Sequence, residues 1–163
     1  MQFMRFLLAG LLAATPLLAD AAGTSIAFGG LKTDPKAPVQ VQADQLAVNQ
    51  ANGSAVFTGN VVITQGEMKL QAAVVNVEYA TDTKKIKTLH ASGGVTVAAG
   101  TDAAKSDEAD YKPDTGDLVM TGNVLLTQGP AAISGQKLVL SLKTGTGTME
   151  GRVTTTFLPG GKL

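Results

Sequence analysis

The sequence predicts an all-β protein whose strands coil into a twisted β-jelly-roll, built from strand-turn-strand repeats of about 29–34 residues. Three observations lead to this fold class. One segment recurs along the chain, apolar residues alternate with a period of two, and the composition suits strands and tight turns. Of the 163 residues, 19 are glycine and only 4% are aromatic, so the apolar content is aliphatic. We expect no helix after the first two dozen residues, because apolar residues never recur there at helical spacing.

Residues 1–21 are predicted to be a signal peptide that is cleaved from the mature protein. Arg5 precedes an apolar run from Phe6 to Leu18, and the run ends in the small-x-small pattern Ala19-Asp20-Ala21. The run is shorter than the roughly 20 residues that cross a bilayer. An uncleaved membrane anchor is the alternative.

The remaining chain divides into three parts. Residues 22–37 contain three glycines and Pro35 with little periodicity and are predicted to form a flexible leader. The folded β-jelly-roll domain is expected over residues 38–159. Residues 160–163 are then a short tail.

A repeated segment defines the unit of the domain. Residues 53–66 return as residues 116–129, and both copies contain Thr-Gly-Asn-Val and Thr-Gln-Gly. A weaker copy lies at residues 89–97, and a fourth begins at Met149. The anchor glycines of the four copies are 34, 29 and 29 residues apart (Gly59, Gly93, Gly122 and Gly151). A second type of strand alternates with this one, so each unit is a strand, a turn, a second strand and a corner.

Alternation predicts which side chains face inward. Apolar residues of one parity form a continuous face on each strand, which is the pattern of a half-buried strand. In the second strand type the apolar set changes parity across a small residue (Ala43, Ala72 or Gly135), which requires a bulge or corner. We therefore expect bent strands in two facing sheets, with a continuous aliphatic trough between them. The predicted inward residues are Val41, Leu46, Val48, Phe57, Val61, Ile63, Leu70, Val75, Val77, Leu89, Val95, Val97, Leu118, Met120, Val124, Leu126, Ile133, Leu138 and Leu140.

The first and last strands of the domain are predicted to be open edges. Residues 39–43 and 153–158 carry no internal proline and no inward charge that would block an added strand. Such edges suit pairing with a strand from a partner, and two different ends favour head-to-tail association. The predicted assembly residues are Val39, Val41, Val153, Thr155 and Phe157.

The sequence has no features that predict nucleic-acid binding, catalysis, or binding of a metal or cofactor. The formal net charge is zero and no basic patch occurs, so we expect no nucleic-acid binding. Cysteine is absent, and no nucleophile lies beside a base, so we expect no enzyme, no metal and no cofactor.

His90 and the acidic residues 102–117 are predicted to lie on the surface. The basic run 84–87 is interpreted as a solvated face, with lipid phosphates at a groove mouth as the alternative.

The chain resembles the OstA-like family of periplasmic lipopolysaccharide-transport proteins. The resemblance covers about residues 38–159 and is carried by Asp44-Gln-Leu46, by the duplicated Thr-Gly-Asn-Val and Thr-Gln-Gly, and by the closing residues 152–159. It implies an OstA-like β-jelly-roll that holds lipid A acyl chains. It also implies partners: an LptC-like component of an inner-membrane complex and an LptD-like outer-membrane translocon. The third unit departs from the pattern at His90, Ala104 and Ala109.

The aliphatic trough and the resemblance together predict lipopolysaccharide transport in the periplasm. Val, Leu and Ile side chains offer acyl chains a non-directional apolar surface. Two other functions stay open. One is a membrane-anchored bridge component of the same fold, and the other is a structural β-repeat protein with a dry core and no ligand.

Overall fold

The computed structural model describes residues 24–27, 31 and 33–157. The predicted signal peptide and the C-terminal tail lie outside the described residues. Within the part of the chain that the structure describes, no helix is long and apolar enough to cross a membrane.

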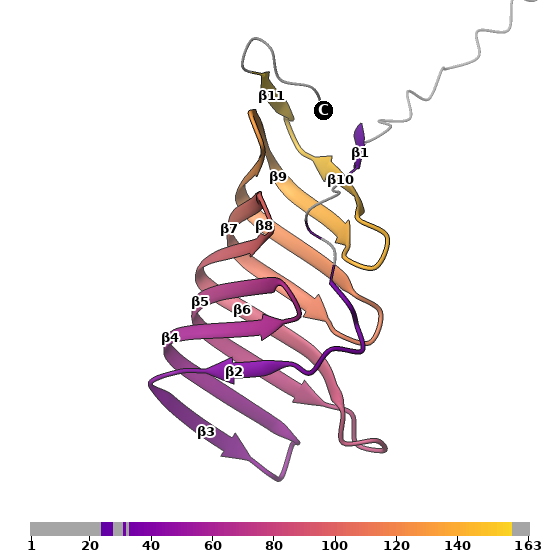
Figure 1. The fold of residues 1–163 in the computed structure, drawn as a ribbon. Coiled ribbons are helices and arrows are strands. Elements are labelled where there is room, and N and C mark those ends of the chain that lie inside the picture. Colours follow the sequence, from indigo (N-terminus) through magenta and orange to yellow (C-terminus); the bar gives the residue numbers. More distant parts are fainter. Residues whose placement is uncertain (1–23, 28–30, 32, 158–163) are drawn as a thin grey trace, which may run out of the picture.

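In the described residues, eleven strands form one antiparallel sheet (Figure 1). Most strands pair with their neighbours in the sequence, in the order β1-β10-β9-β8-β7-β6-β5-β4-β2, while β3 pairs with β4 and β11 pairs with β9. The strands are β1 (Thr24–Ala27), β2 (Gln40–Gln42), β3 (Gln45–Asn49), β4 (Ser54–Gln65), β5 (Met68–Tyr79), β6 (Ile86–Ala99), β7 (Asp102–Lys112), β8 (Asp117–Gln128), β9 (Ala131–Ser141), β10 (Thr146–Glu150) and β11 (Thr154–Phe157).

Corners bend the long strands in their middle. The register between neighbouring strands shifts at Thr58/Val61, Ser92/Val95 and Thr121/Val124. Gly59, Gly93 and Gly122 occupy these corners with φ near +80°, a conformation that only glycine adopts at no steric cost. The register also shifts between Gln71 and Val74, which spans Ala72, and Gly135 pairs with Val124 beside the shift in β8, so the corners predicted at Ala72 and Gly135 from the change of parity are confirmed.

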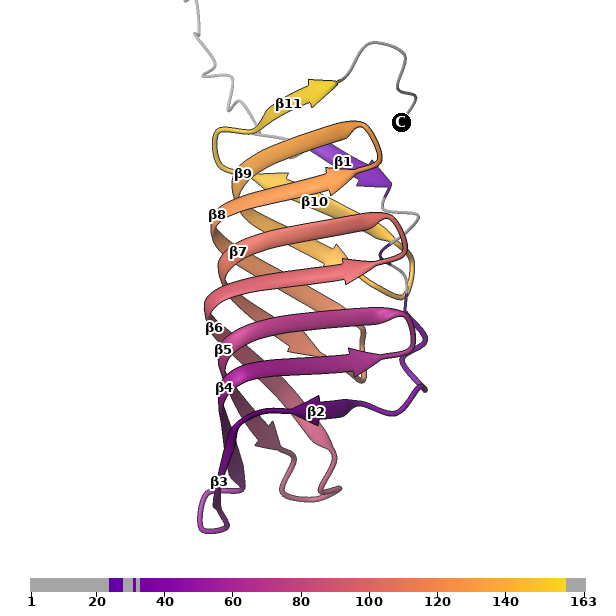
Figure 2. The same ribbon diagram turned by 60° about the vertical axis from the view of Figure 1, so that its left-hand side comes forward.

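The corners fold the single sheet into two facing layers (Figure 2). The first layer contains β2, the C-terminal half of β4, the corresponding halves of β5–β9, and β11. Its end strands are assigned by their pairing: β2 pairs with Val62–Thr64 of β4, and β11 pairs with Ala131–Ser134 of β9. The second layer contains β3, the other halves of β4–β9, β10 and β1. The predicted all-β jelly-roll is confirmed, and the two expected sheets are two halves of one.

Opposite the corners, the hairpin turns of both layers form the other long side of the molecule, which we call the mouth. Leu31 and residues 33–37, here called the mouth segment, lie along this side. The Thr33 amide donates to the Leu142 carbonyl at 3.1 Å, and the Thr33 hydroxyl donates to the Gln65 carbonyl at 2.7 Å. Leu142 follows a second-layer strand and Gln65 ends a first-layer strand, so the mouth segment bridges the two layers.

The leader differs from its prediction. Residues 24–27 form β1, which pairs with β10 through Thr24↔Met149 to Ala27↔Thr146. Leu31 is fully buried in the core. The physical reason is that β10 would otherwise be the edge of the second layer, and an edge strand favours an added partner.

Candidate functional site

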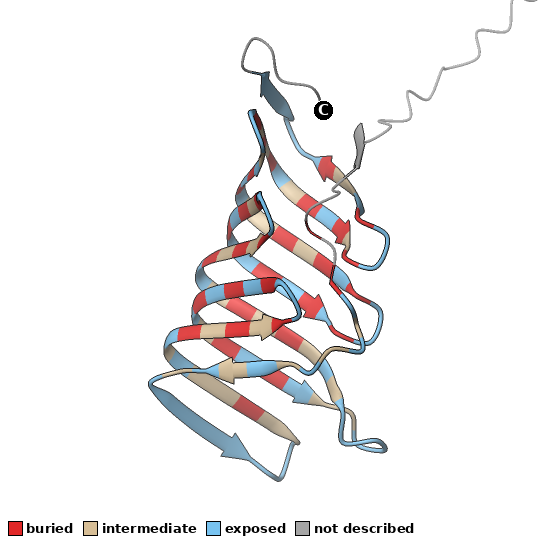
Figure 3. Ribbon diagram, in the orientation of Figure 1, coloured by how far each residue is buried: buried red, intermediate tan, exposed pale blue. Residues whose placement is uncertain are grey.

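The interior between the layers is an aliphatic trough. Fifteen of the nineteen predicted inward side chains are buried, with at most 2% of their surface exposed: Val61, Ile63, Leu70, Val75, Val77, Leu89, Val95, Val97, Leu118, Met120, Val124, Leu126, Ile133, Leu138 and Leu140. Along the long strands, buried residues alternate with intermediate or exposed ones (Figure 3). These residues belong to one continuous cluster that also contains Leu31 and Met149. Among the described residues, no buried side-chain polar atom lacks a hydrogen-bond partner.

The other four predicted inward residues lie at the N-terminal end of the trough. Val41 and Phe57 are half-buried and pack against the core. Leu46 and Val48 are 55% and 62% exposed, so the expectation that they line a covered trough is wrong. They pair with Phe57 and Ala55 and share their face of the sheet. No layer covers them because β3 is the last strand of the second layer.

A buried polar pair joins the two layers near the mouth. The Tyr111 hydroxyl, in the second layer, donates to the Gln65 side-chain carbonyl in the first. The Gln65 amide donates to the Ala37 carbonyl at 3.0 Å and the Pro35 carbonyl at 3.3 Å. Burial raises the pKa of Tyr111 to about 12. The pair therefore fastens the mouth segment over the trough, and sequence reasoning missed it.

The two strands predicted to be assembly edges both lie at ends of the first layer. β2 and β11 are the two terminal strands of the first layer, and each pairs with a strand on one side within the described residues. Val153 is 36% exposed and Phe157 is 51% exposed, while Val39 and Val41 are half-buried against the core. In the second layer, β3 and β1 occupy the corresponding ends, which sequence reasoning did not identify.

The polar candidates lie on the outer surface, with one exception. His90 and Asp110 pair on the outer face through Nδ1 and Oδ1 at 2.7 Å, which confirms the surface placement of the histidine. Asp102 is only 3% exposed, which corrects the prediction for this member of the acidic run. The Thr101 hydroxyl and the Gln128 amide both donate hydrogen bonds to its carboxylate at 3.2 Å, which replace hydration lost on burial.

Together, a bent antiparallel sheet, a strand edge at each end that is unpaired among the described residues, and an aliphatic interior define a β-jelly-roll of the kind that binds apolar ligands between its layers. Residues 40–146 match the family described as LptA/(LptD N-terminal domain) LPS transport protein. The chain belongs to this family.

Similar proteins include two curated relatives with a named role. The chain is 31% identical to the lipopolysaccharide export system protein LptA of Haemophilus influenzae over 147 residues, which covers 83% of this chain and 85% of that protein. It is 39% identical over 61 residues to the lipopolysaccharide export system protein LptH of Pseudomonas aeruginosa, covering 37% of this chain and 34% of that protein. An uncharacterized protein of Rhizobium meliloti is 28% identical over 140 residues, covering 79% of this chain and 75% of that protein.

A solved structure has the same fold. The crystal structure of LptH, described as the LptA homologous periplasmic component of the lipopolysaccharide transport device of Pseudomonas aeruginosa, matches with a TM-score of 0.70. The match covers 78% of this chain and 99% of that chain at 20% sequence identity. At this identity the likeness bears on the fold alone.

Proposed function

We propose that this protein binds lipopolysaccharide in the periplasm, holds the lipid A acyl chains in its trough, and forms part of a bridge between inner-membrane and outer-membrane complexes. The observation that carries the proposal is the continuous aliphatic interior, which runs through β4–β9 and is uncovered at Leu46 and Val48. The family and its lipopolysaccharide-export relatives support it. The role needs no catalytic step and no cofactor from this chain.

The energetics of lipid transfer suit such a surface. Exposing a methylene to water costs roughly 0.8 kcal/mol, so an acyl chain of about a dozen carbons costs on the order of 10 kcal/mol. A trough of Val, Leu and Ile replaces that exposure with dispersion contacts that have no preferred direction. A lipid bound in this way slides along the trough without breaking hydrogen bonds.

Lipid entry requires the mouth segment to move. The trough side chains fill the interior of the molecule, and Leu31 contributes to the same core cluster. An acyl chain that enters between the layers takes the place of Leu31 and separates Thr33 from Gln65 and Leu142. When the segment leaves, water replaces the two bonds of Thr33 and the bonds from the Gln65 amide to Pro35 and Ala37, while the acyl chain fills the space that Leu31 leaves.

Photo-crosslinking from inside the trough tests the proposal. An aromatic photoprobe in place of Phe57 keeps the side-chain volume, and the same probe at Val56 faces the opposite side of β4. We expect lipopolysaccharide adducts from position 57 and few from position 56. A second pair, Leu126 against Thr127, repeats the comparison in β8. Equal adducts from both faces, or none from either, would contradict lipid binding in the trough.

A reversible lock tests the route of entry. A Cβ atom built on Gly66 lies 3.3 Å from Thr33 Oγ1, so the double variant Thr33→Cys/Gly66→Cys places two sulfurs within bonding reach. The natural chain has no cysteine, so no other disulfide competes. We expect the oxidised protein to lose adducts at position 57 and the same sample to regain them after reduction. Unchanged capture in the oxidised state would show that lipid enters without moving the mouth segment.

Bridge formation is proposed to use the strand edges. A partner strand added to β2 or β11 would continue the first layer from one molecule to the next and join their troughs end to end. The partners are a second copy of this chain, an LptC-like component at one end and an LptD-like component at the other. The exposed side chains of Val153, Thr155 and Phe157 are then covered by the neighbour.

Proline in β11 tests the assembly. Thr154→Pro and Thr155→Pro are made separately, because only one of the two amides points away from β9. We expect one variant to abolish self-association in analytical ultracentrifugation while its far-UV circular dichroism matches the parent. If both variants associate like the parent, β11 is not a joint.

The proposed periplasmic location is tested by identifying the first residue of the mature protein. N-terminal sequencing of protein purified from cells is expected to begin after Ala21 or Ala22, where the small-x-small pattern directs cleavage. A sequence that begins at Met1 or Gln2 would favour a membrane-anchored protein instead.

A further inference from the structure

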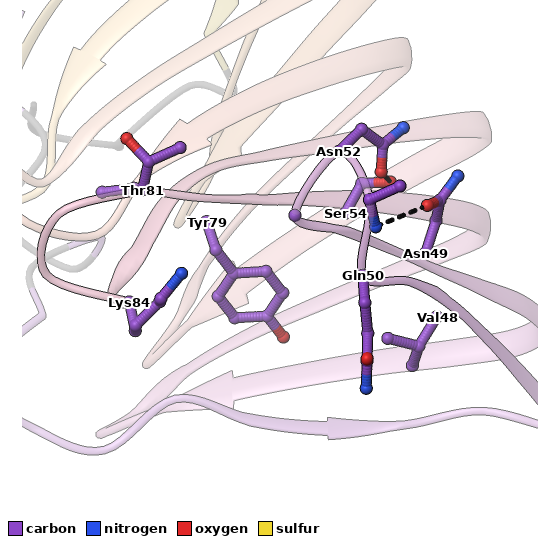
Figure 4. Close-up of a pocket in the computed structure, with 11 residues that line it drawn as sticks. Val48, Asn49, Gln50, Asn52, Ser54, Tyr79, Thr81 and Lys84 are labelled. Atoms are coloured by element: carbon purple, nitrogen blue, oxygen red, sulfur yellow. Dashed lines mark hydrogen bonds between the residues drawn. The ribbon is translucent and has the colours of Figure 1, made fainter.

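A pocket of about 760 Å³ opens at the N-terminal end of the second layer, between the β3–β4 turn and the β5–β6 turn. Figure 4 shows Tyr79 between Lys84 on one side and Gln50 and Val48 on the other. The pocket borders the trough, because Tyr79 also packs against the core cluster and Val48 pairs with the buried Ala55. It lies where the inward face of the sheet is no longer covered.

The lining of the pocket combines three kinds of chemistry. Lys84 is its only residue with a fixed charge at neutral pH, and no ion pair involves this lysine in the described part of the chain. Gln50, Asn52 and Thr81 supply amide and hydroxyl groups. Tyr79 and Val48 supply aromatic and aliphatic surface. This set suits a sugar that carries a phosphate: the ammonium group binds the phosphate, the amides bind sugar hydroxyls, and the ring covers an apolar sugar face.

Two backbone hydrogen bonds shape the turn that carries Lys84. The Lys84 amide donates to the Ala80 carbonyl and the Ala80 amide donates to the Lys85 carbonyl, both at 2.9 Å. Lys84 has a φ of 57°, which is uncommon for a residue with a side chain and is found at ligand-binding turns. Asp82, the carboxylate nearest in sequence, accepts a hydrogen bond from the Thr83 amide at 2.8 Å and does not line the pocket.

We propose that this pocket is a headgroup subsite, which binds the phosphorylated sugar of a glycolipid whose acyl chains lie in the trough. The inference rests on the proposed function, since a lipid in the trough brings its headgroup to an uncovered end. The subsite gives the lipid-binding site a polar end, whereas the aliphatic trough alone binds lipid without a preferred direction. The subsite fixes the depth to which the lipid enters, because the phosphate stops at Lys84.

Binding of two lipids to matched variants tests the subsite. Lys84→Asn removes the charge and keeps the turn, because asparagine adopts positive φ more readily than lysine. Lys84→Arg keeps the charge, and Lys105→Gln removes a lysine on the exposed face of β7 as the control. We expect Lys84→Asn to weaken binding of lipopolysaccharide roughly fivefold, as loss of a charge-assisted contact does, and to leave binding of the dephosphorylated form unchanged. Lys84→Arg and Lys105→Gln should both bind like the parent.

The other outcomes separate this subsite from the proposed function. Equal weakening for both lipids, or none for either, overturns the headgroup subsite while lipid binding by the trough stands. Binding of inorganic phosphate alone that depends on Lys84 would make the pocket a general anion site. A loss of self-association without a loss of lipid binding would make it a protein contact. If the parent binds neither lipid, the proposed function fails as well.

Discussion

The corner at which the third repeat (β6 and β7) begins, between β5 and β6, differs from the corners on both sides of it. At the β3–β4 corner, Asn60 donates to Asp44 at 2.9 Å, and at the β7–β8 corner Asn123 donates to Asp107 at the same distance. At the β5–β6 corner the corresponding residues are Ala73 and Gly94, which have no such polar side chains. The register still shifts there, and Gly93 has nearly the same φ as Gly59 and Gly122. The backbone conformation of the glycine therefore makes the corner, and the Asp–Asn pair is an addition.

The interior of the same repeat is also different. Ala91, Ala104 and Ala109 face inward where the neighbouring repeats have larger apolar side chains, and all three are buried. Tyr111 is fully buried at the mouth end of β7 and reaches Gln65 in the other layer. The third repeat thus replaces aliphatic volume with one large side chain and a hydrogen bond between layers. The trough stays continuous, since the alanines remain part of its wall.

Adding a methyl group to two corner glycines is the strongest way to test this comparison. A Cβ atom on Gly122 would lie 2.3 Å from Asp107 Oδ2 and 2.9 Å from Asp107 Cβ, whereas a Cβ atom on Gly94 meets nothing within 4 Å. Both residues have positive φ, so both variants strain the backbone. We expect Gly122→Ala to lower the free energy of unfolding by about 3–4 kcal/mol and Gly94→Ala by about 1 kcal/mol. Urea denaturation measures both, and equal losses would mean that the intact corner is not tightly packed.

Ionisation of Tyr111 at alkaline pH should destabilise the fold. The folded pKa of Tyr111 is raised by burial from 10.0 to about 12, so the stabilisation from its neutral form is complete below pH 10 and is lost as the pH rises through 12. The expected loss in unfolding free energy is about 2–3 kcal/mol. Tyr111→Phe should remove this loss, and Tyr79→Phe, at the only other tyrosine, should keep it. Identical pH profiles for the two variants would contradict the assignment.

Removing the carboxylate from an intact corner has a smaller expected effect. Asp107→Ala converts the β7–β8 corner to the type found at Ala73 and breaks the exposed hydrogen bond from Asn123. We expect a loss of about 1 kcal/mol in unfolding free energy. Glu108→Ala removes an equal charge from the adjacent exposed position and should cost less. A loss as large as that of Gly122→Ala would show that the Asp–Asn pair, and not the glycine, makes the corner.

Much of the architecture was predictable because each repeat is built from local patterns. Alternation identified the inward face, and the odd step across Ala72 or Gly135 identified the corners, since a strand cannot change parity without an irregularity. Parity says which face a side chain occupies but not whether another layer covers it. For this reason the exposure of Leu46 and Val48 was missed.

Other features depend on contacts between distant segments, and no local pattern reports them. Gln65 and Gln128 stand in identical Thr-Gln-Gly elements, yet Gln65 is 1% exposed and Gln128 is partly exposed. The difference arises because the mouth segment covers Gln65. β1 has only four residues and pairs with a strand near the other end of the chain, so periodicity gave no sign of it.

The position of β1 and the mouth segment also sets an order for folding. The strands β4–β9 each pair with the next strand in sequence, and such local pairs form early because little chain entropy is lost. β1 pairs with β10, and Thr33 bonds to Leu142, across more than a hundred residues. Closing a loop of this length costs more chain entropy than closing a hairpin, so the pair between Thr24 and Met149 forms late. The first strand of the sheet to be made is therefore among the last to find its partner, and the trough closes only after its walls have formed.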